Sequence, residues 1–487
     1  MPWWALAILV FGVNFAIWGT VGLIRLVGKL TVGRWRSRKP AAYQGNVVAL
    51  RHDPAGRRAR QIHLTVDDVA VLIPAHNEGA VIEDSLRAIT KFVPRKNVHV
   101  VSDGSTDDTF EIALRCGVKA IKTRQNVGKA GALQDAIERF KLVERFPVVM
   151  LLDADTRVQE GYFDAALPLF DSPKVAAVAG CVKTDTRRML SPVGNLLVGN
   201  RMRIYAIGQR VLKYGQTSRY LNATPIVPGF ASMYRTAVLP QIDINPAGLV
   251  IEDFNMTFEV YQNGLGHVDF TLGAVAVTQD PDNFRDYIRQ TRRWALGLWQ
   301  TVRRHPPRLN LFTAMLALML TELITSSLLF VTLPLVAAIL VVPDLVTSSV
   351  TWPVFHSVYI AVSSHMTLTR MFYGVVVPDL AITCIVAGLE RRPRLLLAAP
   401  FFPFMRVLDS AIGLWAIPQA WLARTSGVWK SPTRRSAPGK NREIAAQQAA
   451  AAAIPEVLDP AYAVEPAAAS LDEPAVLEEA QSHHASG

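Results

Sequence analysis

The stretch Val148-Val-Met-Leu-Leu-Asp153-Ala-Asp155 decides the fold class, because five apolar residues lead directly into two carboxylates. A short continuous apolar run is typical of a strand buried on both faces, as in a parallel sheet. Side chains at i and i+2 of an extended chain point to the same side, so Asp153 and Asp155 should leave the strand together. Two adjacent negative charges are costly without a cation, and their oxygen atoms suit Mg²⁺ or Mn²⁺. The stretch predicts a cation site at the carboxyl end of a buried strand, where open parallel sheets bind ligands.

Similar apolar runs precede this stretch, and each is followed by a helical pattern. Strands are predicted within 69–78, 98–103 and 118–122, and helices within 79–92, 107–116 and 126–140. Ser105 or Thr106 is expected to cap the second of these helices. Strands that alternate with helices at this spacing predict βαβ units and a parallel sheet. Further strand patterns cover 175–182 and 228–235, and helical patterns cover 191–213 and a segment that begins at 250.

Residues 3–24 carry no charged side chain and are long enough for a bilayer, which takes roughly 20 apolar residues. A signal peptide is the alternative, but no basic residue precedes the run and no small-residue cleavage site follows it. Six basic residues follow within 25–39 instead. By the positive-inside rule the N-terminus faces out, and the next part of the chain is expected to be cytoplasmic.

Three further apolar regions follow the predicted sheet. The run 311–342 is longer than a bilayer requires and contains Glu322 and Pro334, so it should begin in the interface or bend. The region 354–389 is interrupted by His365 and Arg370, and only 371–389 is predicted to span. The block 395–422 has basic residues at both ends, which is more typical of a re-entrant or interfacial segment.

The composition excludes several other classes of protein. The formal net charge is +11 over 487 residues, but no basic helix, zinc spacing or aromatic-studded basic sheet points to nucleic acid. The basic residues instead flank apolar segments. Three widely spaced cysteines give neither a disulfide framework nor a zinc site and indicate a reducing compartment. The Ala-rich segment 443–487 holds eight acidic and no basic residues and is expected to be disordered.

The two carboxylates do not fit the common cation and nucleotide motifs. In an EF-hand loop that began at Asp153, the required glycine would be Val158. Gly128-Lys129 has no glycine five residues upstream, so it is not a P-loop, and no G-x-G-x-x-G follows the first strand. A divalent cation here is therefore predicted to neutralise a diphosphate and to act as a Lewis acid on a leaving group.

Five short motifs carry the chemistry: Pro74-Ala-His-Asn-Glu78, Asp103-Gly-Ser-Thr-Asp107, Asp153-Ala-Asp155, Glu252-Asp253 and Gln290-Thr-Arg-Arg293-Trp294. In their order and approximate spacing, residues 68–300 resemble the membrane-embedded family 2 glycosyltransferases. These are inverting enzymes that include the synthases of poly-N-acetylglucosamine, hyaluronan, chitin oligosaccharides and cellulose. The resemblance implies an α/β GT-A domain, the fold of nucleotide-diphospho-sugar transferases, with flanking transmembrane helices.

On the donor side, the resemblance implies that Asp103 contacts the uracil ring and that the backbone of Pro74–Glu78 forms the pocket wall. Lys129, after Gly128, would border the nucleotide, and Arg293 would pair with the pyrophosphate through its fixed donor fork. Asp153 and Asp155 would form the Asp-x-Asp motif that holds Mg²⁺ or Mn²⁺, with Asp155 the more direct ligand. A helix cap is the alternative role for Asp103, and a surface charge is the alternative for Lys129.

On the acceptor side, the resemblance makes Asp253 the general base, a role typically worth roughly 10²–10⁴-fold in rate. Its alternative role is that of an acid favoured by the helix dipole. Glu252 would be a supporting neighbour. Gln290 and Trp294 would contact the acceptor, with the ring of Trp294 under the sugar, although a helix at a membrane surface carries such residues anyway. Gly229 and Phe230 match the turn before the acceptor site.

Two departures from the family pattern concern specificity and export. The family often has threonine before the Glu-Asp pair, whereas this chain has Ile251, so sugar discrimination is expected to differ. A single N-terminal span and an interfacial last segment put the full translocation channel in doubt. No cyclic-dinucleotide-binding domain is recognisable, which disfavours a cellulose synthase.

The sequence thus predicts a multi-pass enzyme of the cell membrane with a cytoplasmic catalytic domain. It would transfer a hexosyl unit, N-acetylglucosamine in the first instance, from a UDP-sugar to a growing β-linked polysaccharide. Transfer of one sugar to a lipid or glycolipid is one alternative, and a non-catalytic nucleotide-sugar-binding subunit is another; an accessory membrane subunit and membrane lipids are the other expected partners. The predicted domains are a transmembrane helix (1–25), a basic linker (26–67), the GT-A domain (68–304), a membrane region (305–428) and a tail (429–487).

Overall fold

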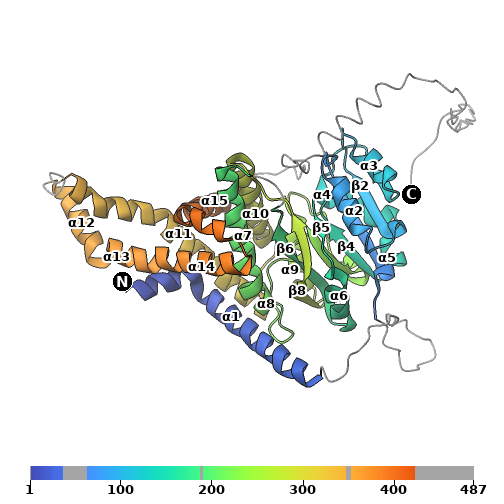
Figure 1. Ribbon diagram of the computed structural model, residues 1–487, viewed down its shortest axis with the longest axis horizontal. Coiled ribbons are helices and arrows are strands. Elements are labelled where there is room, and N and C mark those ends of the chain that lie inside the picture. The colour runs from blue at the N-terminus through green and yellow to red at the C-terminus, as the bar shows by residue number, and fades with distance from the viewer. Residues whose placement is uncertain (1, 37–62, 187–189, 347–351, 423–487) are drawn as a thin grey trace, which may run out of the picture. The chain divides into compact units, whose positions relative to one another are not determined.

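The computed structural model in Figure 1 describes residues 2–36, 63–186, 190–346 and 352–422. The chain divides into two units, Met1–Ala437 and Pro438–Gly487, and only the first contains described residues. Most of the predicted linker and the whole segment 443–487, which the sequence analysis expects to be disordered, therefore lie outside the described residues.

An eight-stranded sheet forms the centre of the domain that carries the motifs, with the strand order β3-β2-β1-β4-β7-β6-β8-β5. The strands are β1 (Val69–Ala75), β2 (Val98–Ser102), β3 (Lys119–Lys122), β4 (Val148–Leu152), β5 (Arg157–Val158), β6 (Val175–Thr184), β7 (Ala231–Arg235) and β8 (His267–Thr278). The predicted parallel arrangement is confirmed for β3, β2, β1 and β4. The sheet as a whole is mixed, because β7 runs antiparallel to β4 and β6, and β5 runs antiparallel to β8. The sequence analysis did not predict β5 or β8.

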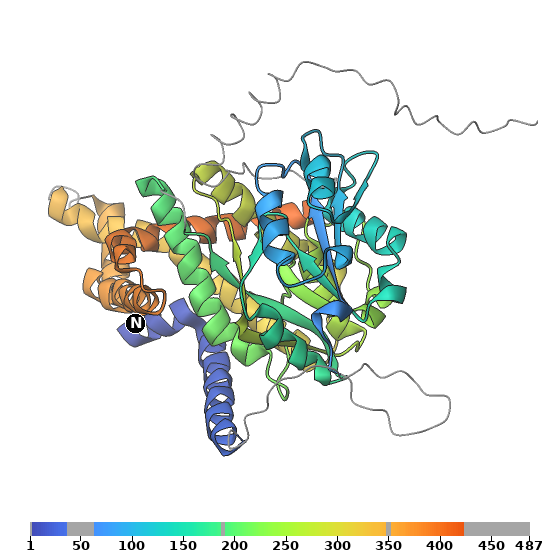
Figure 2. The same cartoon turned by 45° about the vertical axis from the view of Figure 1, so that its right-hand side comes forward.

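Helices cover both faces of the sheet, as Figures 1 and 2 show. One hydrophobic core joins the sheet to α2 (Ile82–Ile89), α3 (Thr109–Arg115) and α6 (Tyr162–Ala166). The opposite core joins it to α4 (Gly128–Arg139), α5 (Leu142–Arg145), α8 (Tyr214–Gln216) and α9 (Glu252–Gln262). All seven residues of β1 and all five of β4 are buried, as their continuous apolar runs predict.

The predicted cap of α3 is wrong. Neither Ser105 nor Thr106 caps this helix; Asp107 Oδ1 accepts a hydrogen bond from the backbone N–H of Thr109 at 3.1 Å. Asn77 Oδ1 accepts the N–H of Thr106 at 2.8 Å, so Thr106 belongs to the turn that links the ends of β1 and β2. A carboxylate is a stronger hydrogen-bond acceptor than a hydroxyl, so Asp107, rather than Ser105 or Thr106, accepts the first N–H of α3.

The antiparallel pairing of β4 and β7 positions the predicted site. Leu152, the last residue of β4, lies opposite Ala231, the first residue of β7. The chain leaving β4 therefore runs beside the chain entering β7, and the N–H of Asp153 donates to the carbonyl of Phe230 at 2.9 Å. This register places the Gly229-Phe230 turn against the Asp153-Ala-Asp155 stretch.

Two long helices connect the sheet domain to the apolar part of the chain. Helix α7 (Pro192–Ile207) continues through a π-helical turn, η4 (Gly208–Lys213), and α10 (Phe284–Arg304) carries the last motif. Helix α7 packs against α14 (Val377–Leu389), and α10 packs against α15 (Phe402–Leu422). The helix predicted over 191–213 is thus present, and the motif Gln290–Trp294 lies within α10.

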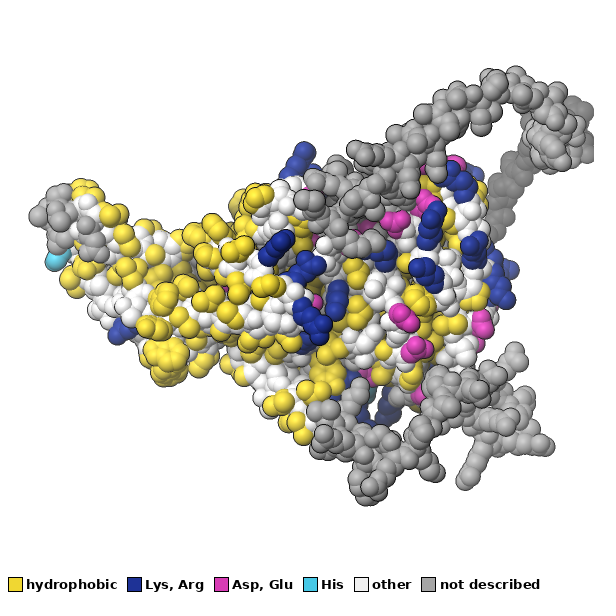
Figure 3. All heavy atoms as spheres, in the orientation of Figure 1, with side chains coloured by type: hydrophobic (Ala, Val, Ile, Leu, Met, Phe, Trp, Pro, Cys, Tyr) yellow, Lys and Arg dark blue, Asp and Glu magenta, His cyan; other side chains and the backbone are white. Residues whose placement is uncertain are grey.

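Four helical segments are long and apolar enough to cross a membrane: Trp3–Gly28, Leu311–Pro343, Leu368–Leu389 and Pro393–Leu422. They belong to α1 (Trp3–Arg36), α11 (Leu311–Leu345), the group α13 (Leu368–Met371), η7 (Phe372–Val376) and α14, and the pair η8 (Pro393–Phe401) and α15. Helix α12 (Pro353–His365) ends at the predicted interruption. The last segment is long enough to span, so its interpretation as interfacial stays a prediction. Figure 3 shows hydrophobic side chains gathered over α11–α14, with Lys and Arg side chains beside them.

Candidate active site

Lys129 is the centre of the candidate active site. Its Nζ atom lies 2.9 Å from Asp153 Oδ1 and 2.9 Å from Glu252 Oε1, and its side chain is only 16% exposed. Lys129 comes from the first turn of α4, Asp153 follows β4, and Glu252 begins α9. One ammonium group therefore joins two predicted motifs that are far apart in the sequence.

Asp253 lies next to this cluster and is held by the turn before β7. The N–H of Gly229 donates to Asp253 Oδ2 at 2.9 Å. A Cβ atom on Gly229 would lie 2.4 Å from Asp253 Oδ1 and 3.0 Å from Lys129 Nζ. Only glycine leaves room here for the carboxylate and the ammonium group to approach the same backbone, which explains the glycine of the Gly229-Phe230 turn.

The local charges separate the two neighbouring acids. Burial raises the pKa of Asp253 to about 8, and the carboxylate of Glu252 adds to the effect, whereas Lys129 opposes it. Burial alone would also raise the pKa of Glu252, but the ammonium of Lys129 holds it below its ordinary value. Glu252 therefore stays ionised as the partner of Lys129, and Asp253 is a carboxyl group with a strong affinity for a proton. A pair of acids with opposite shifts is typical of acid–base chemistry.

Asp155 lies beyond Asp153 and is 6% exposed. Its Oδ1 atom accepts hydrogen bonds from Thr156 Oγ1 at 3.3 Å and from Thr278 Oγ1 at 3.4 Å. Burial raises the pKa of Asp153, Lys129 lowers it, and the nearby Asp155 carboxylate raises it again. The two carboxylates thus lie close enough to interact, as their spacing predicts.

Asp153 and Asp155 could hold a divalent cation only together with ligands from a bound substrate. No group of three or more His, Cys, Asp or Glu side chains that could hold a metal occurs among the described residues. Mg²⁺ is typically held by one or two carboxylates together with substrate phosphates and water, so Asp153 and Asp155 would suffice beside a diphosphate. Asp153 already pairs with Lys129, and the expectation that Asp155 is the more direct ligand stays a prediction.

Asp103 is fully buried and organises the loop before Lys129. Its carboxylate accepts hydrogen bonds from Thr123 Oγ1 and from the N–H groups of Val127 and Gly128, each at 2.9 Å. Its backbone N–H donates to Ala75 O at 2.7 Å, which ties it to the end of β1. Asp103 therefore caps the N-terminus of α4, which is its alternative role, and its predicted contact with a uracil ring stays a prediction.

The first motif forms the opposite side of this loop region. Pro74 is buried within β1, and Glu78 is 1% exposed, so neither presents its side chain to solvent. Asn77 adopts a left-handed backbone conformation with φ 54°, and it accepts the N–H of Thr106. The backbone of this turn is thus fixed against the Asp103 loop, as a pocket wall requires.

Helix α10 reaches the site through residues that follow its motif: Gln300 Oε1 accepts the N–H of Val250 at 3.1 Å, and Gly297 packs on Ile251. A Cβ atom on Gly297 would lie 2.8 Å from Ile251 Cβ, directly before the Glu252-Asp253 pair. The Oε1 atom of Gln290 is buried without a hydrogen-bond partner in the described part of the chain, which is typical of a group that awaits a ligand. Arg293 is half-buried and forms no ion pair with a described carboxylate.

The ring of Trp294 is half-buried, and its partner is a residue that the sequence analysis did not single out. The guanidinium of Arg201 lies 4.4 Å from the centroid of Trp294 and 4.3 Å from that of Tyr287. Arg201 comes from α7 and also donates to Thr291 Oγ1 at 2.6 Å. Since this cation covers part of the ring, the acceptor contact expected for Trp294 would use the remaining aromatic surface. In the sequence, only the run of arginines in 191–213 could have pointed to Arg201.

Two further groups near the site were also missed. Lys213 Nζ donates to Ile226 O at 3.1 Å; burial lowers its pKa to about 8, and Asp253 opposes the shift. Asp280 is 8% exposed and accepts a hydrogen bond from Tyr205 Oη at 2.8 Å. Burial raises the pKa of Asp280 to about 6, and Asp155 contributes to the shift. Neither residue belongs to a motif, and both reach the site only through tertiary packing.

The comparisons with known proteins agree with this arrangement. Residues 67–297 match a family model described as "Glycosyltransferase like family 2". "Probable glycosyltransferase YdaM" of Bacillus subtilis (strain 168) is 27% identical over 241 residues, 47% of this chain and 54% of the relative. A "Poly-beta-1,6-N-acetyl-D-glucosamine synthase" of Staphylococcus epidermidis is 23% identical over 258 residues, 50% of this chain and 59% of the relative.

The chain spans about half the length of the curated relatives it matches. A solved structure, "Mannosyltransferase PcManGT from Pyrobaculum calidifontis in complex with GDP-Man and Mn2+", is 18% identical. That comparison covers 82% of this chain and 98% of the other, with a TM-score of 0.46. The family match covers all five motifs and the mixed sheet that brings four of them together. Residues 67–297 therefore form a family 2 glycosyltransferase domain with the GT-A fold.

Proposed function

We propose that this protein is an inverting glycosyltransferase that transfers N-acetylglucosamine from a UDP-sugar to the end of a growing β-linked polysaccharide. The observation that carries the proposal is the cluster of Lys129, Asp153, Glu252 and Asp253 around Gly229. It combines a buried cation, a strand-end carboxylate and a carboxyl group with a high pKa, which are the parts that a displacement at a diphosphate-activated sugar needs.

Asp253 acts as the general base in this proposal. The N–H of Gly229 fixes one carboxylate oxygen, and the acceptor hydroxyl is proposed to approach the other. A pKa of about 8 gives this carboxylate a greater proton affinity than an exposed aspartate, whose pKa is near 3.9. When the acceptor oxygen attacks the anomeric carbon, Asp253 takes its proton, and the bond to the UDP oxygen breaks on the opposite face.

The leaving diphosphate is handled by the donor side of the cluster. Asp155, with Asp153, would hold a divalent cation, which would supply positive charge to the diphosphate and act as a Lewis acid on the leaving group. Lys129 keeps Asp153 and Glu252 ionised and oriented beside it. Arg293 binds a phosphate oxygen from α10, and the Asp103 loop positions the nucleoside.

The proposed sugar comes from a relative. The relative that is 23% identical over 50% of this chain is named as a poly-β-1,6-N-acetyl-D-glucosamine synthase. Ile251, the residue before Glu252, is buried against Gly297 of α10, so it holds the Glu252-Asp253 pair against that helix.

Four segments long and apolar enough for a membrane accompany the domain. Helix α10, which carries Gln290 and Trp294, packs directly on α15. The acceptor side of the site therefore adjoins the membrane region. This proximity supports transfer coupled to export across the cell membrane, with the domain on the cytoplasmic side.

A direct assay tests the proposal. Membranes that contain the full chain are incubated with radiolabelled UDP-sugars and Mg²⁺ or Mn²⁺, and the products are separated by size. We expect label from UDP-N-acetylglucosamine in a polymer, and none with the Asp253→Asn variant. Label found only in a lipid would contradict polymer synthesis and leave single-sugar transfer. Absence of transfer from every UDP-sugar would contradict the proposed reaction.

A further inference from the structure

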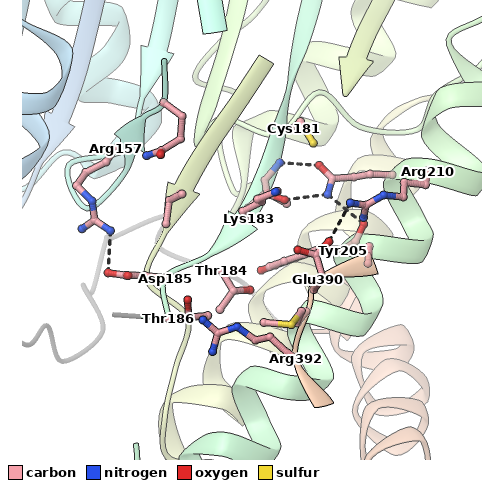
Figure 4. A pocket seen from close by; sticks show the side chains of 16 residues that line it. Arg157, Cys181, Lys183, Thr184, Asp185, Thr186, Tyr205, Arg210, Glu390 and Arg392 are labelled. Atoms are coloured by element: carbon pink, nitrogen blue, oxygen red, sulfur yellow. Dashed lines mark hydrogen bonds and ion pairs between the residues drawn. The ribbon is translucent and has the colours of Figure 1, made fainter. Parts of the chain in front are cut away.

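A cavity of about 410 Å³ lies outside the predicted active-site residues, where the glycosyltransferase domain meets the apolar helices. Its walls come from β5, the end of β6, the α7–η4 helix and the turn between α14 and η8, and Figure 4 shows it from close by. Its volume is within the range of small-molecule sites. The turn at Glu390–Arg392 lies between the candidate spans Leu368–Leu389 and Pro393–Leu422, so the cavity adjoins the expected membrane surface.

Basic residues outnumber acidic ones in the lining of this cavity. Arg157 pairs with Asp185 at 2.8 Å, and Arg210 pairs with Glu390 at 2.9 Å. These pairs account for both carboxylates of the lining. The two other cations, Lys183 and Arg392, are exposed and form no ion pair with a carboxylate in the described ranges. The cavity therefore carries a formal excess of two positive charges.

The walls of the cavity are held in place by specific contacts. Gln209 clamps the edge of β6, because its side chain accepts from the N–H of Val182 at 2.6 Å and donates to the carbonyl of Val182 at 2.9 Å. Gln209 and Arg210 lie in the π-helical turn η4, a feature frequently found at functional sites.

The turn on the opposite wall, between α14 and η8, also has a fixed backbone. Arg391 adopts a left-handed conformation with φ 53°, which glycine would adopt more easily. The N–H of Arg392 returns to Ala387 O at 2.8 Å and closes the turn. This backbone turn directs Glu390 and Arg392 to the same cavity, and non-glycine residues in such conformations are concentrated at functional sites.

We propose that this cavity binds a phosphate-bearing anion, and that its occupant is the headgroup of an anionic phospholipid. Arg side chains supply planar donor forks and Lys183 supplies a point charge, the combination that suits phosphate oxygens. Basic pockets beside membrane helices on the cytoplasmic side are typical sites for anionic headgroups. Soluble phosphate or pyrophosphate offers the same chemistry, and the experiment separates the two sources. Cys181 also lines the cavity, but burial raises the pKa of its thiol to about 11, so a reactive thiolate is not the function of this cavity.

The test uses the full chain, purified in detergent, and measures retained lipid by native mass spectrometry. The probes are phosphatidylglycerol, phosphatidylcholine and inorganic pyrophosphate. The variant is Lys183→Gln with Arg392→Gln, two exposed side chains whose loss leaves no buried carboxylate unpaired. The matched control is Lys91→Gln with Arg115→Gln, two exposed cations that do not line the cavity. Thermal unfolding checks that both proteins are folded, and Lys183→Gln alone replaces the double variant if that protein does not fold.

We expect phosphatidylglycerol to bind more tightly than phosphatidylcholine. The double variant should lose about thirtyfold in phosphatidylglycerol affinity, since each basic residue near an anionic surface contributes roughly a factor of five. The control should lose nothing. If only pyrophosphate binds with this dependence, the lipid assignment is overturned and the occupant is soluble. If phosphatidylglycerol and pyrophosphate each bind the double variant as tightly as they bind the control, the anion site itself is overturned. Binding is measured without sugar transfer, so this outcome is independent of the proposed function.

Discussion

Gly229 and Asp253 are 24 positions apart in the sequence, yet the backbone N–H of Gly229 donates to the Asp253 carboxylate at 2.9 Å. The contact exists because β7 pairs antiparallel with β4 and begins where β4 ends. It brings the predicted general base, the Asp153 stretch and Lys129 to the same turn. The geometry of this turn is the basis of the first prediction.

Gly229→Ala should reduce transfer strongly while the protein stays folded. The added Cβ would lie 2.4 Å from Asp253 Oδ1, so the carboxylate must leave the N–H of residue 229. A displacement of this kind costs roughly 10²-fold in rate. The control is Gly208→Ala, because a Cβ there meets no atom within 4 Å. Equal loss in both variants, measured as initial rates in membranes, would contradict the role of the turn.

The sequence predicted the elements of this site better than their arrangement. The continuous apolar runs of β1, β2 and β4 are readable because both faces of these strands are buried. Strand β8 alternates buried and less buried positions in two short halves, and an irregular stretch at 271–273 interrupts the alternation, so neither half is long enough to stand out. The direction of β7 depends on tertiary pairing, and no local pattern specifies it.

The site residues also divide into those that the sequence identifies and those that only the folded structure identifies. Asp153 and Asp253 belong to motifs, Lys129 was singled out beside Gly128, and their convergence follows once the sheet is known. Arg201 is identified only by its position over the ring of Trp294, a contact between two helices remote in sequence. The full burial of Asp103 was equally unpredictable, because three hydrogen bonds from loop 123–128 produce it.

The rate of transfer should rise with pH through about 8. Burial raises the pKa of Asp253 to about 8, and a general base acts in its deprotonated form. The active fraction should therefore increase about tenfold between pH 7 and pH 9. The measurement is kcat/KM for the acceptor as a function of pH, with the residual rate of Asp253→Asn as the flat reference. A profile with no rise above pH 6 would show that another group is the base.

The same carboxyl group links pH to stability with the opposite sign. Its folded-state pKa of about 8 lies above the ordinary aspartate value of 3.8, so the folded protein binds the extra proton between these values. Its contribution to stability is present below about pH 4 and is lost as the pH rises to about 8. Asp253→Asn should remove this dependence, and thermal unfolding across that range of pH measures it. An unchanged pH dependence in the variant would contradict the raised pKa.

Lys129→Gln should lower both activity and stability. Lys129 compensates two carboxylates, and Glu252 is 5% exposed. Removing one partner of a buried ion pair typically costs about 3–5 kcal/mol. The control is Lys122→Gln, whose pair with Glu111 is exposed on both sides. Equal unfolding temperatures for the two variants would contradict the central position of Lys129.

Glu322 should stabilise a break in the first apolar helix. The backbone of α1 is not helical at Gly12, where φ is 79°, and the N–H groups of Val13 and Asn14 donate to Glu322 Oε1 at 2.5 Å and 3.1 Å. Glutamine would keep one acceptor oxygen but would turn the other, which accepts from Asn14 Nδ2 at 2.8 Å, into a donor, so Glu322→Gln should cost about 1–3 kcal/mol.

Thermal unfolding of the detergent-solubilised chain measures this loss. Thr332→Val is the matched control on the same helix, because the Thr332 hydroxyl is exposed and bonds only to carbonyls of α11. If Glu322→Gln and Thr332→Val unfold at the same temperature, the carboxylate does not stabilise the break.

The central claim is that Asp253 removes the proton from the acceptor while Lys129 and the Asp153-Ala-Asp155 stretch hold the donor. Purified Asp253→Asn protein tests it most directly when UDP binding and sugar transfer are measured on the same sample. The account predicts UDP affinity within about twofold of the unmodified protein and a loss of transfer of roughly 10²–10⁴-fold. Transfer at an undiminished rate with the asparagine in place would contradict it.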